Sequence, residues 1–95
     1  MGHKLEYCVY VLKSLADGDL YAGFTTDLRQ RLTAHFDGEV PSTAPRRPLR
    51  LIFCEYYLSK GDALRREGYF KTSTGKRALR IMLADSLREL PGNGS

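Results

Sequence analysis

The sequence predicts a single α+β domain, with a three-stranded antiparallel sheet flanked by helices. Three observations predict this class. Two segments rich in β-branched and aromatic residues flank a short turn, a third segment is apolar almost throughout, and the other segments repeat apolar residues at helical spacing. The expected order along the chain is strand, strand, helix, strand, helix, helix. A length of 95 residues is enough for one core and too short for two.

The first two strands are expected to form a hairpin. Residues 6–14, EYCVYVLKS, have the composition of a strand, and residues 20–24, LYAGF, provide its return. Between them, the Asp17-Gly18 pair is typical of a tight reversal of the chain. The two strands should therefore be antiparallel neighbours.

A first helix is predicted over residues 27–37. Its start is marked by TTD, residues 25–27, where a threonine or aspartate side chain can accept a hydrogen bond from a free backbone N–H. Gly38 marks its end. The buried face should be formed by three residues at four-residue spacing: Leu28, Leu32 and Phe36.

The next segments predict a loop, a strand and two helices. Residues 38–48 contain three prolines and no apolar period, so no regular element is expected there. Residues 49–58, LRLIFCEYYL, are apolar almost throughout, which predicts a central strand covered on both faces. One helix should run from Ser59, as N-cap, to about residue 72, and another over 75–89. Their expected inward-facing residues are Ala63, Leu64, Phe70, Leu79, Met82, Leu83 and Leu87.

The domain is expected to occupy residues 1–90, with PGNGS, residues 91–95, as a disordered tail. Its charge favours a polyanionic partner, because 15 Lys and Arg residues outnumber 11 Asp and Glu residues. The basic residues cluster in the loop PRRPLR, residues 45–50, and at Arg65, Arg66, Lys71, Lys76, Arg77 and Arg80. Nucleic acid is the commonest polyanion, and a solvated basic face is the alternative.

The cysteines and the apolar segments indicate in which cellular compartment the protein is expected. Cys8 and Cys54 lie in strand-like segments without C-x-x-C spacing, so we expect two reduced, buried thiols on neighbouring strands. The first residues, MGHKLEY, lack the hydrophobic segment of a signal peptide, and no apolar run has the length of a membrane span. The sequence therefore predicts a cytoplasmic protein without a membrane partner.

Several polar side chains near the end of the second strand are not explained by a packed core. Arg31 and His35 are four residues apart and share one helix face, close to the strand end that carries Tyr21. Tyr10, on the paired strand, can point to the same region. Further along, Glu67 lies among basic residues, where a carboxylate is either a paired surface charge or a metal ligand.

The spacing of these residues resembles the signature of the GIY-YIG nuclease family. Cys8-Val9-Tyr10 and Tyr21-Ala22-Gly23, separated by ten residues, are similar to its two tripeptides. The family's arginine, eight residues after the last glycine, matches Arg31, and the histidine or tyrosine four residues later matches His35. Its glutamate, in an Ala-Leu-x-x-Glu context, matches Glu67 in ALRRE.

The resemblance covers about residues 6–83 and is strongest to small stand-alone bacterial members, the UPF0213-like proteins. The chain also resembles the nuclease domain of structure-specific junction endonucleases. The resemblance implies a metal-dependent endonuclease that hydrolyses phosphodiester bonds in DNA, including branched or single-stranded forms, in repair or recombination. The catalytic residues that it implies are Tyr10, Tyr21, Arg31, His35 and Glu67, with Gly23 in the structural motif.

The resemblance also implies individual roles. Glu67 would hold Mg²⁺ or Mn²⁺, and Arg31 would bind phosphate through its planar guanidinium. Tyr21 would orient or deprotonate the attacking water, and deprotonation would require a pKa lowered by the arginine or the metal. Tyr10 and His35 would position the water or relay its proton. The residues expected to contact nucleic acid are Thr43, Arg46, Arg47, Arg66 and Lys71.

Each of these residues also has a purely structural explanation. The tyrosines can form cross-strand aromatic pairs, and Arg31 can be a solvated surface cation. His35 can interact with the helix dipole, and Glu67 can form an ion pair with Lys71. Phe24 stands where many family members carry a lysine or polar residue, and Leu79 occupies the position of a late asparagine. These departures leave two alternatives: a catalytically weak nucleic-acid-binding module, and a nuclease subunit that needs a protein partner for target recognition.

Overall fold

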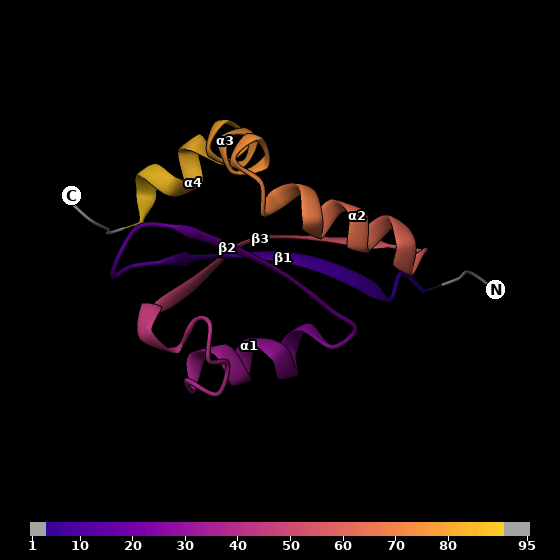
Figure 1. Ribbon diagram of the computed structural model, residues 1–95, viewed down its shortest axis with the longest axis horizontal. Helices are drawn as coiled ribbons and strands as arrows, with labels where there is room; N and C mark the ends of the chain where they lie inside the picture. Colours follow the sequence, from indigo (N-terminus) through magenta and orange to yellow (C-terminus); the bar gives the residue numbers. More distant parts are fainter. Residues whose placement is uncertain (1–3, 91–95) are drawn as a thin grey trace.

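The computed structural model of this protein describes residues 4–90, and the predicted tail, residues 91–95, lies outside the described residues. The elements follow the order strand, strand, helix, strand and then helices. A three-stranded antiparallel sheet lies between helices on its two faces (Figure 1). The predicted α+β class is confirmed.

Strands β1 (Tyr7–Ser14) and β2 (Leu20–Thr25) form the expected antiparallel hairpin, with Tyr10 opposite Gly23. Gly18 in the turn has a φ of +78°, a conformation that glycine adopts without strain. The Asp-Gly pair therefore forms the reversal that the sequence indicates.

Strand β3 (Leu49–Tyr57) pairs with β1, which gives the strand order β2-β1-β3. The prediction that this segment is the central strand is therefore wrong, because β1 is central and β3 lies at an edge. Seven of the eight β1 residues are buried, whereas Leu49 is the one buried residue of β3. The apolar run of β3 arises because both faces of the sheet are covered, with Leu51 packed on one face and Phe53 on the other.

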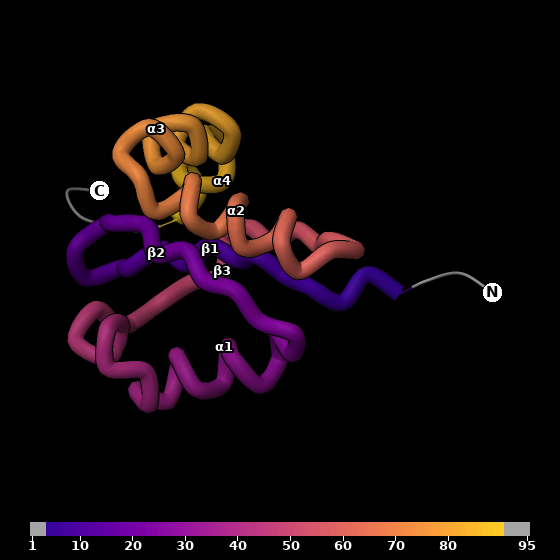
Figure 2. The backbone as a smooth tube through the Cα atoms, turned by 45° about the vertical axis from the view of Figure 1, so that its right-hand side comes forward, coloured from indigo at the N-terminus to yellow at the C-terminus, as the bar shows by residue number. Residues whose placement is uncertain are grey.

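Helices cover the two faces unequally (Figures 1 and 2). One face carries α1 (Leu28–Phe36), and the other carries α2 (Lys60–Phe70), α3 (Ser73–Met82) and α4 (Ala84–Glu89). Side chains alternate along β1, so Tyr10 packs toward α1, whereas Val9 and Val11 pack toward α2 and α3. The chain therefore has two small apolar clusters that share the central strand.

Helix α1 begins and ends as predicted. The carboxylate of Asp27 accepts a hydrogen bond from the backbone N–H of Gln30 at 3.1 Å, and Gly38, with a φ of +80°, follows the last turn. The segment beyond is not wholly irregular, contrary to expectation, because it contains one turn of 3₁₀ helix, η1 (Ala44–Arg46). Pro45 is accommodated because the first turn of a helix does not use its backbone N–H groups.

The helix predicted over residues 75–89 is instead two helices that meet at Leu83, where φ is −110°. Three residues expected to face inward are nearly half-exposed or more: Phe36, Leu64 and Met82. In a helix of 3.6 residues per turn, residues four apart are rotated by about 40° around the helix axis. Over the two steps from Leu28 to Phe36 this rotation carries Phe36 out of the buried face. Leu64 directly follows buried Ala63 and so points about 100° away from it. Across residues 4–90, no helix has the length and apolar character needed to cross a lipid bilayer.

Both cysteines are free thiols on neighbouring strands, but Cys8 is buried and Cys54 is exposed. The expectation of two buried thiols is therefore wrong for Cys54, because β3 is an edge strand. Burial raises the pKa of Cys8 to about 11, which keeps its thiol protonated at neutral pH.

Candidate active site

A pocket of about 330 Å³ opens across the outer edge of β2. Successive β2 residues line it, together with side chains of α1 from one face of the sheet and of α2 and α3 from the other. The pocket brings together all five residues predicted to be catalytic: Tyr10, Tyr21, Arg31, His35 and Glu67. Gly23, Thr43 and Lys71 of the predicted set also line it. Side chains from both faces of the sheet meet here because β2 is an edge strand.

Gly23 lets the ring of Tyr10 lie directly against β2. The two residues are opposite each other in the hairpin, and a Cβ atom at position 23 would lie 2.2 Å from the Tyr10 hydroxyl oxygen and 2.3 Å from Cζ. Real Cβ atoms do not approach other atoms so closely. The glycine of the motif is therefore explained by close approach of a side chain rather than by an unusual backbone conformation.

A chain of hydrogen bonds links Arg31 to the loop after α1. Arg31 Nε donates to the Tyr10 hydroxyl at 3.3 Å, and that hydroxyl lies 2.7 Å from Nε2 of His35. On the other side of the imidazole, Nδ1 lies 2.7 Å from Oγ1 of Thr43. Both hydroxyls can donate or accept, so the two contacts fit either neutral tautomer of the imidazole: in one of them Tyr10 donates to Nε2 and Nδ1–H donates to Thr43.

The groups in this chain are neutral near pH 7, apart from the arginine. Burial, and then the Arg31 charge, lower the pKa of His35, so its imidazole is uncharged. Burial raises the pKa of Tyr10 against the opposing effect of Arg31, so its phenol stays protonated. Thr43, one of the residues predicted to contact nucleic acid, is buried, and its Oγ1 lies within hydrogen-bond distance of His35.

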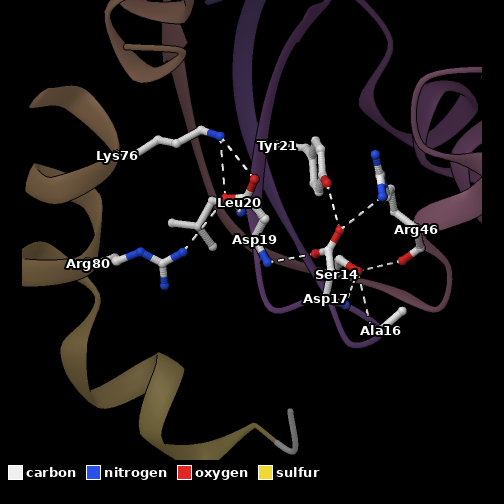
Figure 3. A network of polar contacts seen from close by, with 9 residues as sticks. All are labelled: Ser14, Ala16, Asp17, Asp19, Leu20, Tyr21, Arg46, Lys76 and Arg80. Carbon is white, nitrogen blue, oxygen red and sulfur yellow. Dashed lines mark hydrogen bonds and ion pairs between the residues drawn. The ribbon is translucent and has the colours of Figure 1, made fainter. Parts of the chain in front are cut away.

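Tyr21 projects from β2 toward the turn of the hairpin (Figure 3). Its hydroxyl donates to Oδ2 of Asp17 at 2.9 Å, and Lys76 Nζ lies 5.7 Å from its ring centre. Burial, and then the hydrogen bond to Asp17, raise the pKa of Tyr21 above its ordinary value. This direction is opposite to the lowering that a phenolate base would require.

Glu67 presents one carboxylate to the pocket, with 19% of its side chain exposed. Lys71 Nζ lies 3.1 Å from that carboxylate, so the ion pair considered from the sequence is also formed. Within residues 4–90, no three His, Cys, Asp or Glu side chains cluster as metal ligands. A single carboxylate suits Mg²⁺ or Mn²⁺, which keep several waters and take oxygen ligands from phosphate, and does not suit Zn²⁺.

Three of the basic residues predicted to bind nucleic acid lie outside the pocket lining. Arg66 Nε donates to Glu55 at 2.7 Å, and its guanidinium covers the ring of Phe70 at 4.4 Å. Arg46 Nη1 lies 3.6 Å from Asp17, and Arg47 Nε donates to a backbone carbonyl. These arginines therefore have structural partners outside the pocket, whereas Lys71 lines the pocket and pairs with Glu67.

Two residues of this region are not among the site residues that the sequence predicts. Lys76 on α3 lines the pocket and pairs with Asp19 at 3.3 Å. Asp17, recognised only as a turn residue, binds the hydroxyl of Tyr21. The basic C-terminal segment gave a general signal for Lys76, but only the folded hairpin places Asp17 beside Tyr21.

Comparison with known proteins agrees with this geometry. The family model described as the GIY-YIG catalytic domain matches residues 6–80. The chain belongs to the GIY-YIG family. Its match covers every element that contributes one of the five pocket residues, from β1 to α2.

Curated relatives of this GIY-YIG chain carry the name UPF0213 protein, which states no function. One from Bacillus pumilus is 44% identical over 75 residues, which cover 78% of this chain and 76% of the relative. One from Streptococcus agalactiae is 39% identical over 77 residues, or 80% and 86% of the two chains. One from Staphylococcus aureus is 39% identical over 78 residues, or 81% and 94%. The predicted resemblance to small stand-alone UPF0213-like members is confirmed.

GIY-YIG membership assigns the chain to a nuclease family. DNA is the substrate that this domain implies, and its members generally depend on a divalent metal. No solved structure shows a significant match to the chain.

Proposed function

We propose that this protein is an endonuclease that hydrolyses phosphodiester bonds in DNA with Mg²⁺ or Mn²⁺. The observation that supports this most directly is the single pocket lined by five polar side chains from four elements. A packed core requires no such convergence of tyrosine, arginine, histidine and glutamate. The pocket is also lined by Lys71 and Lys76, which suit a phosphate backbone.

Arg31 is the proposed phosphate ligand. It is exposed on α1 and lines the pocket, so its guanidinium is accessible to a substrate. The hydrogen bond from Nε to Tyr10 fixes the orientation of the guanidinium and leaves its other N–H groups to donate to phosphate oxygens. Preorganised donors of this kind stabilise the negative charge that develops on the phosphate during attack.

Tyr10 and His35 are proposed to position Arg31 rather than to touch DNA. They are 2% and 4% exposed, and their hydrogen bonds run from the arginine into the protein. In the proposed tautomer, Nε2 of His35 accepts a hydrogen bond from the Tyr10 hydroxyl, and the phenol oxygen accepts the hydrogen bond from Arg31 Nε. Thr43 completes the chain by fixing the imidazole ring.

Glu67 is the proposed metal ligand. A bound divalent cation would supply positive charge next to the phosphoryl and leaving oxygens. When no cation is bound, the ion pair with Lys71 keeps the Glu67 carboxylate oriented toward the pocket. Tyr21, which lines the same pocket from β2, is proposed to hold the attacking water through its neutral phenol.

The test is nicking of supercoiled plasmid, single-stranded DNA and branched DNA by purified protein with Mg²⁺ or Mn²⁺. We expect metal-dependent cleavage that is lost in Glu67→Gln and Arg31→Ala. Matched controls are Asp62→Asn on the same helix and Arg29→Ala on α1, which lie outside the pocket lining. Wild-type protein that is as inert as Glu67→Gln on every substrate would refute the proposal.

The Glu67–Lys71 ion pair favours a second candidate, a module that binds nucleic acid without cutting it. That module would bind DNA with an affinity that falls steeply with salt and is unchanged in Glu67→Ala. A preference for branched or single-stranded DNA, a role in repair or recombination, and a protein partner for targeting are extensions of the main proposal. We propose the cytoplasm as its compartment, where DNA is accessible and free thiols such as Cys8 persist.

A further inference from the structure

The turn of the hairpin carries a carboxylate that is aimed at Tyr21 (Figure 3). Oδ2 of Asp17 accepts the Tyr21 hydroxyl hydrogen at 2.9 Å, and Arg46 Nη1 lies 3.6 Å from the same oxygen. The other oxygen, Oδ1, accepts the backbone N–H of Asp19 at 2.8 Å. Both carboxylate oxygens therefore have assigned partners, and the group cannot rotate without losing them.

Ser14 fixes the turn that holds this carboxylate. Its buried hydroxyl oxygen accepts the backbone N–H groups of Ala16 at 3.1 Å and Asp17 at 3.0 Å. The same hydroxyl donates to the carbonyl oxygen of Arg46 at 2.7 Å. The turn is thus tied to η1, and the position of Asp17 is set by the fold rather than by a mobile loop.

Tyr21 forms a wall between two pockets. It lines the proposed active-site pocket and also an outer pocket of about 480 Å³ that includes Asp17 and Arg46. Its hydroxyl hydrogen points to Asp17 in the outer pocket. Within residues 4–90 no side chain donates a hydrogen bond to the phenol oxygen of Tyr21, so its lone pairs remain available to a water molecule.

We propose that Asp17 is a positioning residue for Tyr21. Asp17 orients the Tyr21 hydroxyl so that its oxygen accepts a proton from the attacking water, and the Asp17 carboxylate takes the proton that Tyr21 gives up. This inference rests on the proposed nuclease function. It explains how a tyrosine that stays protonated can still help to deprotonate water.

The proton transfers balance. One O–H bond of water breaks and its proton joins the Tyr21 oxygen, while the original Tyr21 proton passes to Oδ2 of Asp17. The water oxygen uses the freed electron pair to bond to phosphorus. The P–O bond to the leaving sugar oxygen breaks, and that oxygen keeps the electron pair and takes a proton from solvent. Asp17, with 33% of its side chain exposed, then returns its proton to bulk water.

The charges around Tyr21 are consistent with this role. Asp17 and Asp19 face it from the turn, Arg46 from η1 and Lys76 from α3. Burial, and then Asp17 and Asp19, raise the pKa of Tyr21 and Arg46 opposes them, so the phenol is the stable form at neutral pH. Asp17 itself has a lowered pKa, chiefly because of the backbone hydrogen bond from Asp19, so its carboxylate is ionised and accepts the hydrogen bond from Tyr21.

The first test measures the coupling without any cleavage. The phenol of Tyr21 is titrated by NMR in wild-type protein and in Asp17→Asn, with its ring signal assigned by its loss in Tyr21→Phe. We expect the pKa of Tyr21 to fall in Asp17→Asn. Asp19→Asn removes the same charge from the same turn without breaking the bond to Tyr21, and should produce a smaller shift. Equal shifts in the two variants would overturn the inference.

The second test measures turnover. Asp17→Asn should lower kcat about 100-fold with KM nearly unchanged, whereas Asp19→Asn should leave kcat close to that of wild type. In a Tyr21→Phe background, Asp17→Asn should have no further effect on kcat, because Asp17 acts through the phenol. Active wild-type protein with an equally active Asp17→Asn variant would overturn this inference alone. Inactive wild-type protein would refute the nuclease function, and the catalytic role of Asp17 with it.

Discussion

Replacement of Gly23 by alanine tests the close packing at the centre of the candidate site. The added Cβ would lie 2.2 Å from the Tyr10 hydroxyl oxygen and 2.3 Å from Cζ, so the ring must move. Overpacking of this kind costs about 1–3 kcal/mol. Movement of the ring also breaks its hydrogen bonds to buried His35 and to Arg31, which adds about 1–3 kcal/mol. We therefore expect a loss of about 2–6 kcal/mol in the free energy of unfolding.

The measurement is urea unfolding followed by circular dichroism, with Gly68→Ala as the control. Gly68 lies within α2, and a Cβ there meets nothing within 4 Å. Alanine at that position should raise the free energy of unfolding by about 0.5–1 kcal/mol, because it favours the helix. The two substitutions are chemically identical and should have opposite signs. A Gly23→Ala variant as stable as wild type would show that Tyr10 is not held over β2, and the proposed anchoring of Arg31 would fail.

Three further predictions concern the pocket. Arg31→Lys keeps the charge but loses the planar fork, so kcat/KM for DNA cleavage should fall about 100-fold, and activity close to wild type would contradict the proposed phosphate contact. Lys71→Met should tighten Mn²⁺ binding in calorimetry, because the ammonium group competes for Glu67, and unchanged affinity would mean that this pair does not oppose the metal. Burial, and then Arg31, hold the pKa of His35 below its ordinary value of 6.5, so the unfolded chain binds that proton first as pH falls. The free energy of unfolding should therefore decrease as pH falls below about 6.5. His35→Gln should remove that component in urea unfolding at several pH values, and an identical pH profile in the variant would refute the assignment.

Local sequence signals predict the elements that depend on local chemistry. The Asp17-Gly18 pair indicates the hairpin because few residues tolerate the turn conformation. Asp27 and Gly38 define α1 because capping is a property of neighbouring backbone groups. The motif spacing predicts which five side chains share a pocket, since strand register and helix period fix where each one points.

Features that depend on distant segments were not predicted. The sequence gives no reason for β3 to lie at an edge, because coverage of both faces produces the same apolar run in either position. Thr43 lies in a segment without periodicity, so its bond to His35 appears only once the loop is folded. Asp17 was recognised as a turn residue, and its contact with Tyr21 follows from the exact geometry of the reversal.

The location of the pocket at the β2 edge has a consequence for self-association. The outer side of this strand carries backbone N–H and C=O groups that no fourth strand covers within residues 4–90. A peptide that added itself there as a strand would occupy the pocket that Arg31 and Glu67 line. Oligomers that extend the sheet through β2 are thus incompatible with an open site, and short extended peptides that pair with this strand are a rational starting point for inhibitors.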